Sequence, residues 1–148
     1  MFIHPMTMNE TVGILMKSEQ NKSNTNLRPT GECVIQTIAM PANTNSNGDI
    51  FGGWLLSQMD LGGAVLAYKK AQGRIVTKAI AEIVFYHPVK VGATVACYAN
   101  LERQGQTSLT IAVESWSTPR ETMTPHLVNQ GIFTYVAIDE QGKPRAIS

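Results

Sequence analysis

The stretch FGGWLLSQMDLGGAVLAYKKAQG (51–73) constrains the fold more than any other part of the chain. Its length and its content of Leu, Met and Ala favour a helix despite its glycines, and Lys69, Lys70 and Gly73 are typical of a helix end. Apolar side chains surround almost the whole circumference of this helix. A helix that is apolar all round is expected to be buried, so the rest of the chain must supply a large cover for it.

The remaining sequence offers only strand patterns for that cover. A Pro-, Asn-, Ser- and Gly-rich loop precedes the helix. The strand-like segments are 32–40 before the loop and 74–87, 91–104, 105–117 and 131–142 after the helix. The connections near 88–92 and 103–106 are short enough for hairpins. We therefore predict an α+β fold, in which a curved antiparallel sheet of about five strands wraps one long buried helix.

The length of 148 residues fits one domain with a sizeable core. The polar run SEQNKSNTN (18–26) cannot bury enough surface to order itself, so we expect a poorly ordered N-terminal arm over residues 1–30 and a folded domain over residues 31–148. One sheet over one helix leaves the outer sheet face and the sheet edges uncovered. We therefore expect the chain to dimerise.

Several classes of function are disfavoured by the residue types present. A net charge of +1 without a basic cluster gives no sign of a nucleic-acid partner. The three histidines are scattered and no CxxC occurs, so no metal site is expected. Neither GxGxxG nor GxxxxGK[ST] is present, which disfavours the common nucleotide-binding loops.

The cellular location is predicted from cysteines and hydropathy. Cys33 and Cys97 lie far apart in apolar runs, which is typical of reduced core residues in an intracellular protein. The N-terminus lacks the basic and apolar regions of a signal peptide, and no stretch approaches the roughly 18 apolar residues of a membrane span. We expect a cytoplasmic protein without a membrane partner.

Asp60 is the anomaly of the predicted helix. Its neighbours at contacting spacings are apolar (Leu56, Met59, Leu61 and Ala64), and a buried, unpaired carboxylate is costly. In one interpretation Asp60 faces solvent or bonds to nearby backbone. In the other it lines a cavity and acts as a base or nucleophile. The residues alone leave both interpretations open.

The start of the helix is the second candidate site. Gly52 and Gly53 either allow flexibility and close packing, or they let a ligand approach backbone N–H groups that can polarise a carbonyl. Asp49 either caps the helix or shapes the loop, or it orients water or substrate. Gly53 and Asp60 lie about 10 Å apart along a helix. If both act on one carbonyl group, they must therefore come from different chains at a dimer interface.

The stretch AMPANTNSNGDIFGGWLLSQMDLGGAVLA (39–67) resembles the signature of the hotdog-fold acyl-CoA thioesterases, in particular the YciA-like bacterial group. The segments 73–92, 104–116 and 133–147 resemble the later parts of these enzymes, so the resemblance covers roughly residues 33–147. It implies hydrolysis of acyl-CoA to a free acid and CoA. It also implies that no cofactor is needed, since CoA is part of the substrate, and that homodimers assemble into a hexamer, a trimer of dimers.

The resemblance also assigns roles to residues. It implies that Asp60 is the catalytic carboxylate and that backbone amides of Ile50–Gly53 polarise the thioester oxygen, with Gly52 and Gly53 at the centre. Asp49 stands where related thioesterases use an Asn as a second catalytic group. The resemblance places Thr107 and Ser108 along bound CoA. The residues expected to contact substrate are Asn47, Phe51, Trp54, Thr107 and Ser108.

The working hypothesis is therefore a thioester enclosed by two subunits. Its carbonyl faces the helix N-terminus of one subunit, and Asp60 of the other subunit activates water or attacks directly. Two alternatives stay open. One is a hotdog hydratase or dehydratase acting on enoyl thioesters, although no histidine lies within residues 41–61. The other is a module that binds acyl-CoA without cleaving it.

Overall fold

The computed structural model describes residues 28–148. Within them lie a 3₁₀ helix, one α-helix and five strands. Their bounds are β1 (Glu32–Ile38), η1 (Pro41–Asn43), α2 (Gly52–Ala71), β2 (Ile75–Phe85), β3 (Thr94–Gln104), β4 (Ser108–Thr118) and β5 (His126–Ala137). The predicted order of strand, loop, helix and four strands is confirmed. The arm predicted over residues 1–30 lies outside the described residues, apart from residues 28–30.

The strands form one antiparallel sheet in the order β1-β3-β4-β5-β2. The predicted turn near 103–106 joins β3 and β4 as a hairpin. The hairpin predicted near 88–92 is wrong, because β2 pairs with β5 at one edge and lies apart from β3. The connection instead bonds to the segment before the helix: Ile50 N–H donates to Val89 O at 2.9 Å and Ala39 N–H to Ala93 O at 2.9 Å.

The last strand begins earlier than predicted, at His126 rather than at residue 131. Leu127 pairs with Trp116 and Asn129 pairs with Ser115, so this segment already belongs to the β4–β5 ladder. The polar pair Asn129 and Gln130 interrupts the apolar pattern and hides the strand in the sequence. Asn129 is nevertheless fully buried.

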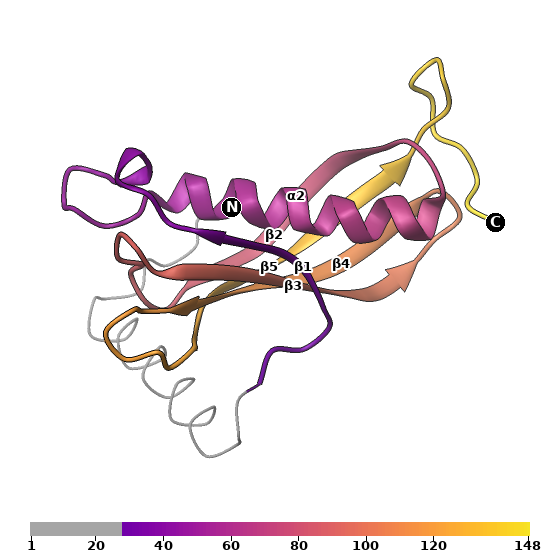
Figure 1. Ribbon diagram of the computed structural model, residues 1–148. Coiled ribbons are helices and arrows are strands. Elements are labelled where there is room, and N and C mark those ends of the chain that lie inside the picture. Colours follow the sequence, from indigo (N-terminus) through magenta and orange to yellow (C-terminus); the bar gives the residue numbers. More distant parts are fainter. Residues whose placement is uncertain (1–27) are drawn as a thin grey trace, which may run out of the picture.

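Helix α2 lies along one face of the sheet (Figure 1). The side chains that it buries there are Leu55, Met59, Gly62, Gly63, Leu66, Ala67 and Ala71. Its opposite face stays open in a single chain: Leu61 is 58% exposed, Val65 40% and Tyr68 51%. Within a single chain the sheet covers only one side of the predicted buried helix. Apolar residues on the other side need a different cover.

Close approach between helix and sheet explains one glycine in α2. A Cβ atom on Gly62 would lie 2.7 Å from Val34 Cγ2, so only glycine lets β1 pack this tightly against the helix. The helix ends as predicted near Lys69 and Lys70, with Gln72 in the left-handed conformation at φ +52°.

The cysteine prediction holds for one residue of the two. Cys97 is buried, whereas Cys33 is exposed near the start of β1, and both are free thiols. Within residues 28–148, no helix has the length and apolar character needed to cross a membrane.

Candidate active site

Asp60 is anchored through one carboxylate oxygen. The Thr77 hydroxyl donates to Asp60 Oδ1 at 2.7 Å. The Tyr135 hydroxyl lies 3.2 Å from the same Oδ1 and 2.8 Å from the backbone carbonyl of Asp60. No hydrogen bond within residues 28–148 reaches Oδ2. The carboxylate therefore has one oxygen that is held and one that is available to a ligand.

The position of Asp60 on the helix explains why it is only half-buried. Met59 before it is fully buried against the sheet, and Leu61 after it is 58% exposed. Asp60 thus lies at the boundary between the covered and uncovered faces of α2. A carboxylate here can accept hydrogen bonds from the protein on one side and meet a ligand or a second chain on the other.

Thr77 and Tyr135 are direct partners in the β2–β5 ladder. Their side chains therefore emerge from the same place on the sheet, under Asp60. The register of β2 shifts immediately afterwards, between Thr77 and Ala79. Such bulges redirect side chains and are frequent beside active sites.

Tyr135 is fully buried, with 0% of its surface exposed. Burial and the neighbouring Asp60 carboxylate raise the pKa of Tyr135 far above its usual value, so the hydroxyl stays protonated. A Cβ atom on Gly63 would lie 2.2 Å from this hydroxyl oxygen. The absence of a side chain at Gly63 therefore makes room for the Tyr135 hydroxyl.

The N-terminus of α2 is the second part of the candidate site. The first intrahelical bonds use Trp54 and Leu55, whose N–H groups donate to Phe51 O. No bond within residues 28–148 uses the N–H groups of Gly52 or Gly53, which leaves them free to bind an anion or a carbonyl. Gly52 borders a cleft of about 340 Å³. That cleft is lined by Asn45, Asp49, Ile50, Gly52, Leu55, Phe85, Tyr86, His87, Pro88 and Val89.

Asp49 lies in this cleft but is held by a cation. Lys90 Nζ forms an ion pair with Asp49 Oδ1. The backbone N–H of Asp49 donates to Asn45 Oδ1 at 3.2 Å, and the Asn47 N–H donates to the same oxygen at 2.9 Å. Asn45 therefore organises the turn, and Asn47 itself is exposed. Asp49 provides no side-chain cap for α2.

The other predicted substrate contacts occupy two ends of the molecule. Phe51 is 56% exposed at the N-cap of α2. Trp54 is partly buried and packs against an apolar cluster that includes Ile50, Leu55 and Val89. Thr107 lies in the β3–β4 turn at the opposite end, and Ser108 is the first residue of β4. The C-terminal segment links that turn to the helix end, because Ile147 N–H donates to Gln106 O at 2.8 Å and Arg145 Nη2 donates to Ala71 O at 2.8 Å.

A single chain thus does not assemble all predicted residues in one place. It brings Asp49, Gly52 and Gly53 together at the helix start, places Asp60 in the middle of the helix, and leaves Thr107 and Ser108 at the far end. Sequence reasoning missed Thr77, Tyr135 and Lys90. A carboxylate expected among apolar neighbours requires donors, but nothing in the strand patterns indicates which residues supply them.

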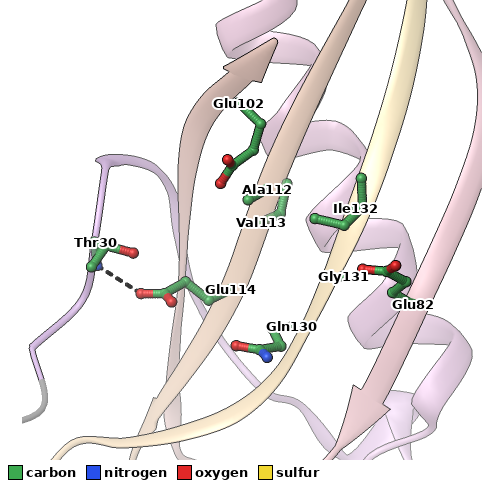
Figure 2. A pocket seen from close by; sticks show the side chains of 9 residues that line it. All are labelled: Thr30, Glu82, Glu102, Ala112, Val113, Glu114, Gln130, Gly131 and Ile132. Atoms are coloured by element: carbon green, nitrogen blue, oxygen red, sulfur yellow. Dashed lines mark hydrogen bonds between the residues drawn. The ribbon is translucent and has the colours of Figure 1, made fainter.

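A second hollow lies on the sheet face away from the helix (Figure 2). Its acidic side chains are Glu82, Glu102 and Glu114, and the Thr30 N–H donates to Glu114 Oε1 at 2.7 Å. None of the predicted site residues lines this hollow. In the part of the chain described by the structure, no three His, Cys, Asp or Glu residues are grouped as a metal site.

Comparison with known proteins identifies the family. Residues 47–124 match the family described as Thioesterase superfamily. The chain is 47% identical over 129 residues to the acyl-CoA thioester hydrolase YciA of Escherichia coli K12. The aligned region covers 84% of this chain and 97% of that relative. The chain belongs to the thioesterase superfamily and, within it, to the acyl-CoA thioester hydrolases.

Solved structures agree with this assignment. The hexameric thioesterase y2039 from Yersinia pestis superposes with a TM-score of 0.79 at 49% identity, covering 82% of this chain and 98% of that one. Cj0915, a hexameric hotdog fold thioesterase of Campylobacter jejuni, superposes with a TM-score of 0.78 at 36% identity, covering 82% and 93%. The predicted hotdog fold is therefore confirmed.

Proposed function

We propose that the chain hydrolyses acyl-CoA to a free carboxylic acid and CoA, with Asp60 as the catalytic carboxylate. The observation that carries the proposal is the anchoring of Asp60: Oδ1 is held by protein hydroxyls, whereas Oδ2 has no partner within residues 28–148. A charged oxygen beside an exposed apolar surface suits a base or nucleophile. The names of the relatives support the choice of thioester hydrolysis.

The reaction needs only groups that the chain and the substrate supply. In the general-base route Asp60 takes a proton from water as the water oxygen bonds to the thioester carbon. In the direct route the Asp60 oxygen itself bonds to that carbon, and water later cleaves the anhydride. N–H groups of Gly52 and Gly53 donate to the developing oxyanion. The C–S bond then breaks and CoA leaves as the thiolate, which needs little acid assistance because a thiol has a pKa of about 8.5, and which then takes a proton from solvent. No cofactor enters either route.

The proposed site is shared between two chains. Gly53 and Asp60 lie seven residues apart on one helix, so they face the same side but stand about 10 Å apart along the axis. If two α2 helices pack antiparallel about a two-fold axis, Asp60 of each chain lies opposite Gly53 of the other. The same arrangement brings Thr107 and Ser108 of one chain towards the helix start of its partner.

The uncovered surface supports this dimer. Exposed apolar side chains on the open face of α2 continue onto the edge strand β2; they are Leu61, Val65, Tyr68, Val76, Ile80, Val84 and Phe85. Within residues 28–148, one side of β2 is unpaired, because β5 is the only strand there that pairs with β2. We propose that two copies join through this surface and that three such dimers form a hexamer, as the similar structures are hexameric.

The remaining predicted residues take supporting roles in this proposal. Phe51 and Trp54 at the helix start contact the acyl or pantetheine part of the substrate. Thr107 and Ser108 of the partner chain lie along CoA, and Asn47 shapes the loop at the entrance. Asp49, held by Lys90, orients water or substrate near Gly52. We also propose a cytoplasmic location, which the two free cysteines support.

The first experiment measures thiol release from a panel of acyl-CoA esters. The wild-type protein should release CoA, and Asp60→Ala should lose at least about 100-fold in kcat, the scale of a lost general base. Undiminished turnover in the variant would remove Asp60 from the mechanism. Hydration of an enoyl-CoA without thiol release would favour a hydratase, and binding of CoA without either reaction would favour a binding module.

The second experiment tests whether sites are shared. Asp60→Ala chains and Gly53→Val chains should each be nearly inactive alone. When the two are mixed and refolded together, half of the dimers are mixed and each has one intact site, so activity should return to about a quarter of wild type. A mixture as inactive as its components would place both residues in the same chain's site.

A further inference from the structure

We infer that Tyr135 is a positioning residue that holds Asp60 with Oδ1 turned into the protein and Oδ2 turned towards the substrate. The inference rests on the proposed function, in which Asp60 is the catalytic carboxylate. It concerns the strand β5, which carries none of the residues predicted from the sequence to form the site. The contacts of the Tyr135 hydroxyl carry it.

The Tyr135 hydroxyl bridges the backbone and the side chain of the same residue. Its oxygen lies 2.8 Å from the Asp60 carbonyl oxygen and 3.2 Å from Asp60 Oδ1. A phenol carries one proton, so the two acceptors share it in a three-centre bond. Sharing one donor fixes the carboxylate relative to the helix backbone, which restricts rotation of the Asp60 side chain.

Thr77 completes the restraint from the neighbouring strand. Its hydroxyl donates to the same Oδ1 at 2.7 Å, and it is the ladder partner of Tyr135. Two donors on Oδ1 occupy the two lone pairs of that oxygen. Oδ2 therefore remains as the oxygen that takes a proton from water or attacks the thioester.

Tyr135 serves as a donor and not as an acid. Its side chain is fully buried, and its ring stacks on Phe133 with centroids 6.4 Å apart. Burial and the Asp60 carboxylate raise its pKa, so the hydroxyl is protonated at neutral pH. Because the proton already points at Asp60, it is not available to the leaving thiolate.

The test compares Tyr135→Phe with Tyr98→Phe. Both remove one phenol oxygen and keep the ring, but Tyr98 lies on β3, where Cys97 and Ala99 on either side face the helix core. In the assembled protein, Tyr135→Phe should lower kcat about tenfold, the effect of one lost hydrogen bond in the transition state, with KM changed less than about twofold. Tyr98→Phe should leave both parameters at wild-type values.

The pH profile separates positioning from a loss of fold. Removing a donor from a carboxylate disfavours its charged form, so the acid limb of kcat/KM should move to higher pH in Tyr135→Phe. Thr77→Val should move it in the same direction. The double variant should lose more than the product of the two single losses, because either hydroxyl alone still holds Oδ1.

The outcomes distinguish the inference from the function on which it rests. If wild type releases thiol, Asp60→Ala does not, and Tyr135→Phe matches wild type in kcat and pH profile, only the inference fails. A rise in KM with unchanged kcat would also overturn it. If wild type itself releases no thiol, the proposed function fails. A tenfold loss of kcat with a shifted acid limb and an unchanged oligomer supports the inference.

Discussion

The two aspartates next to the start and the middle of α2 have opposite surroundings. Asp49 is held by the ammonium group of Lys90, whereas Asp60 is held by two neutral hydroxyls. A lysine partner neutralises a carboxylate and competes with any substrate for it. Hydroxyl partners orient a carboxylate and leave its charge in place. The surroundings of Asp49 therefore suit a carboxylate that is fixed in a loop, and those of Asp60 suit the catalytic role that we propose for it.

Their positions reinforce this difference. Asp49 lies in a loop whose backbone is organised by Asn45, and loops are in general more mobile than the elements that they connect. Asp60 lies on a 20-residue helix, whose buried side, which includes four glycine and alanine residues, packs on the sheet. Sites built on rigid elements hold their geometry more precisely than sites on loops. We therefore expect catalysis to depend steeply on Asp60 and weakly on Asp49.

The largest expected effect comes from exchanging each aspartate for its amide. Asp60→Asn should lower kcat by at least about 100-fold, because the amide is neither base nor nucleophile. Asp49→Asn should lower kcat less than about tenfold, the scale of one hydrogen bond. Thiol-release kinetics on both purified variants measure the ratio. Equal losses would show that the two carboxylates act as one unit and would break the comparison.

The adjacent glycines Gly62 and Gly63 allow a test of the contact between Tyr135 and Asp60. Alanine at Gly63 would press on the Tyr135 hydroxyl, whereas alanine at Gly62 would press on Val34. Overpacking costs about 1–3 kcal/mol, so both variants should have a lower melting temperature. Only Gly63→Ala should also lower kcat, about tenfold, since one hydrogen bond to Asp60 is displaced. A loss of kcat in Gly62→Ala of the same size would attribute both effects to packing.

Alkaline unfolding tests the protonated state of Tyr135. The folded protein keeps this proton because burial and Asp60 raise the pKa, whereas an unfolded tyrosine ionises near pH 10. The unfolded state therefore binds fewer protons above about pH 10, and stability falls as pH rises. Tyr135→Phe should reduce that fall by up to about 1.4 kcal/mol per pH unit. Denaturant unfolding between about pH 8 and 11 measures it.

Some loss of stability at alkaline pH is still expected in Tyr135→Phe. Burial also raises the pKa of Tyr86 and of Tyr98, so both residues also make the folded protein less stable as pH rises. Identical pH dependence in wild type and Tyr135→Phe would contradict the buried, protonated hydroxyl.

The smallest effect is expected from removing the ion pair between Lys90 and Asp49. Lys90 is 67% exposed and Asp49 27%, so solvent screens their ion pair. Lys90→Met should lower the free energy of unfolding by less than about 1 kcal/mol. The difference from wild type should shrink when salt is raised from about 0.01 M to 1 M. Thermal unfolding at both salt concentrations measures it, and a salt-independent loss would indicate packing of the lysine stem instead.

The sequence predicted the elements of the fold, but of the contacting residues Asp60, Thr77 and Tyr135 it singled out only Asp60. The apolar helix 51–73 and the strand patterns predicted α2 and the five strands. They did not predict strand order, because short connections such as 88–92 bond to distant loop segments. Similarly, Asp60 was visible as a charge among apolar residues, but Thr77 and Tyr135 were ordinary strand residues. Their role depends on a cross-strand register that only three-dimensional pairing fixes.

The unequal edges of the sheet have a consequence for assembly size. One edge is β2, with 11 residues and an apolar surface, and the other is β1, with 7 residues. If two copies join through β2, both outer borders of the combined sheet are β1, and no β2 is left to extend it. Further growth along the hydrogen-bond direction would then have to use the shorter β1 edges, whereas a larger particle can also form by stacking the uncovered sheet faces.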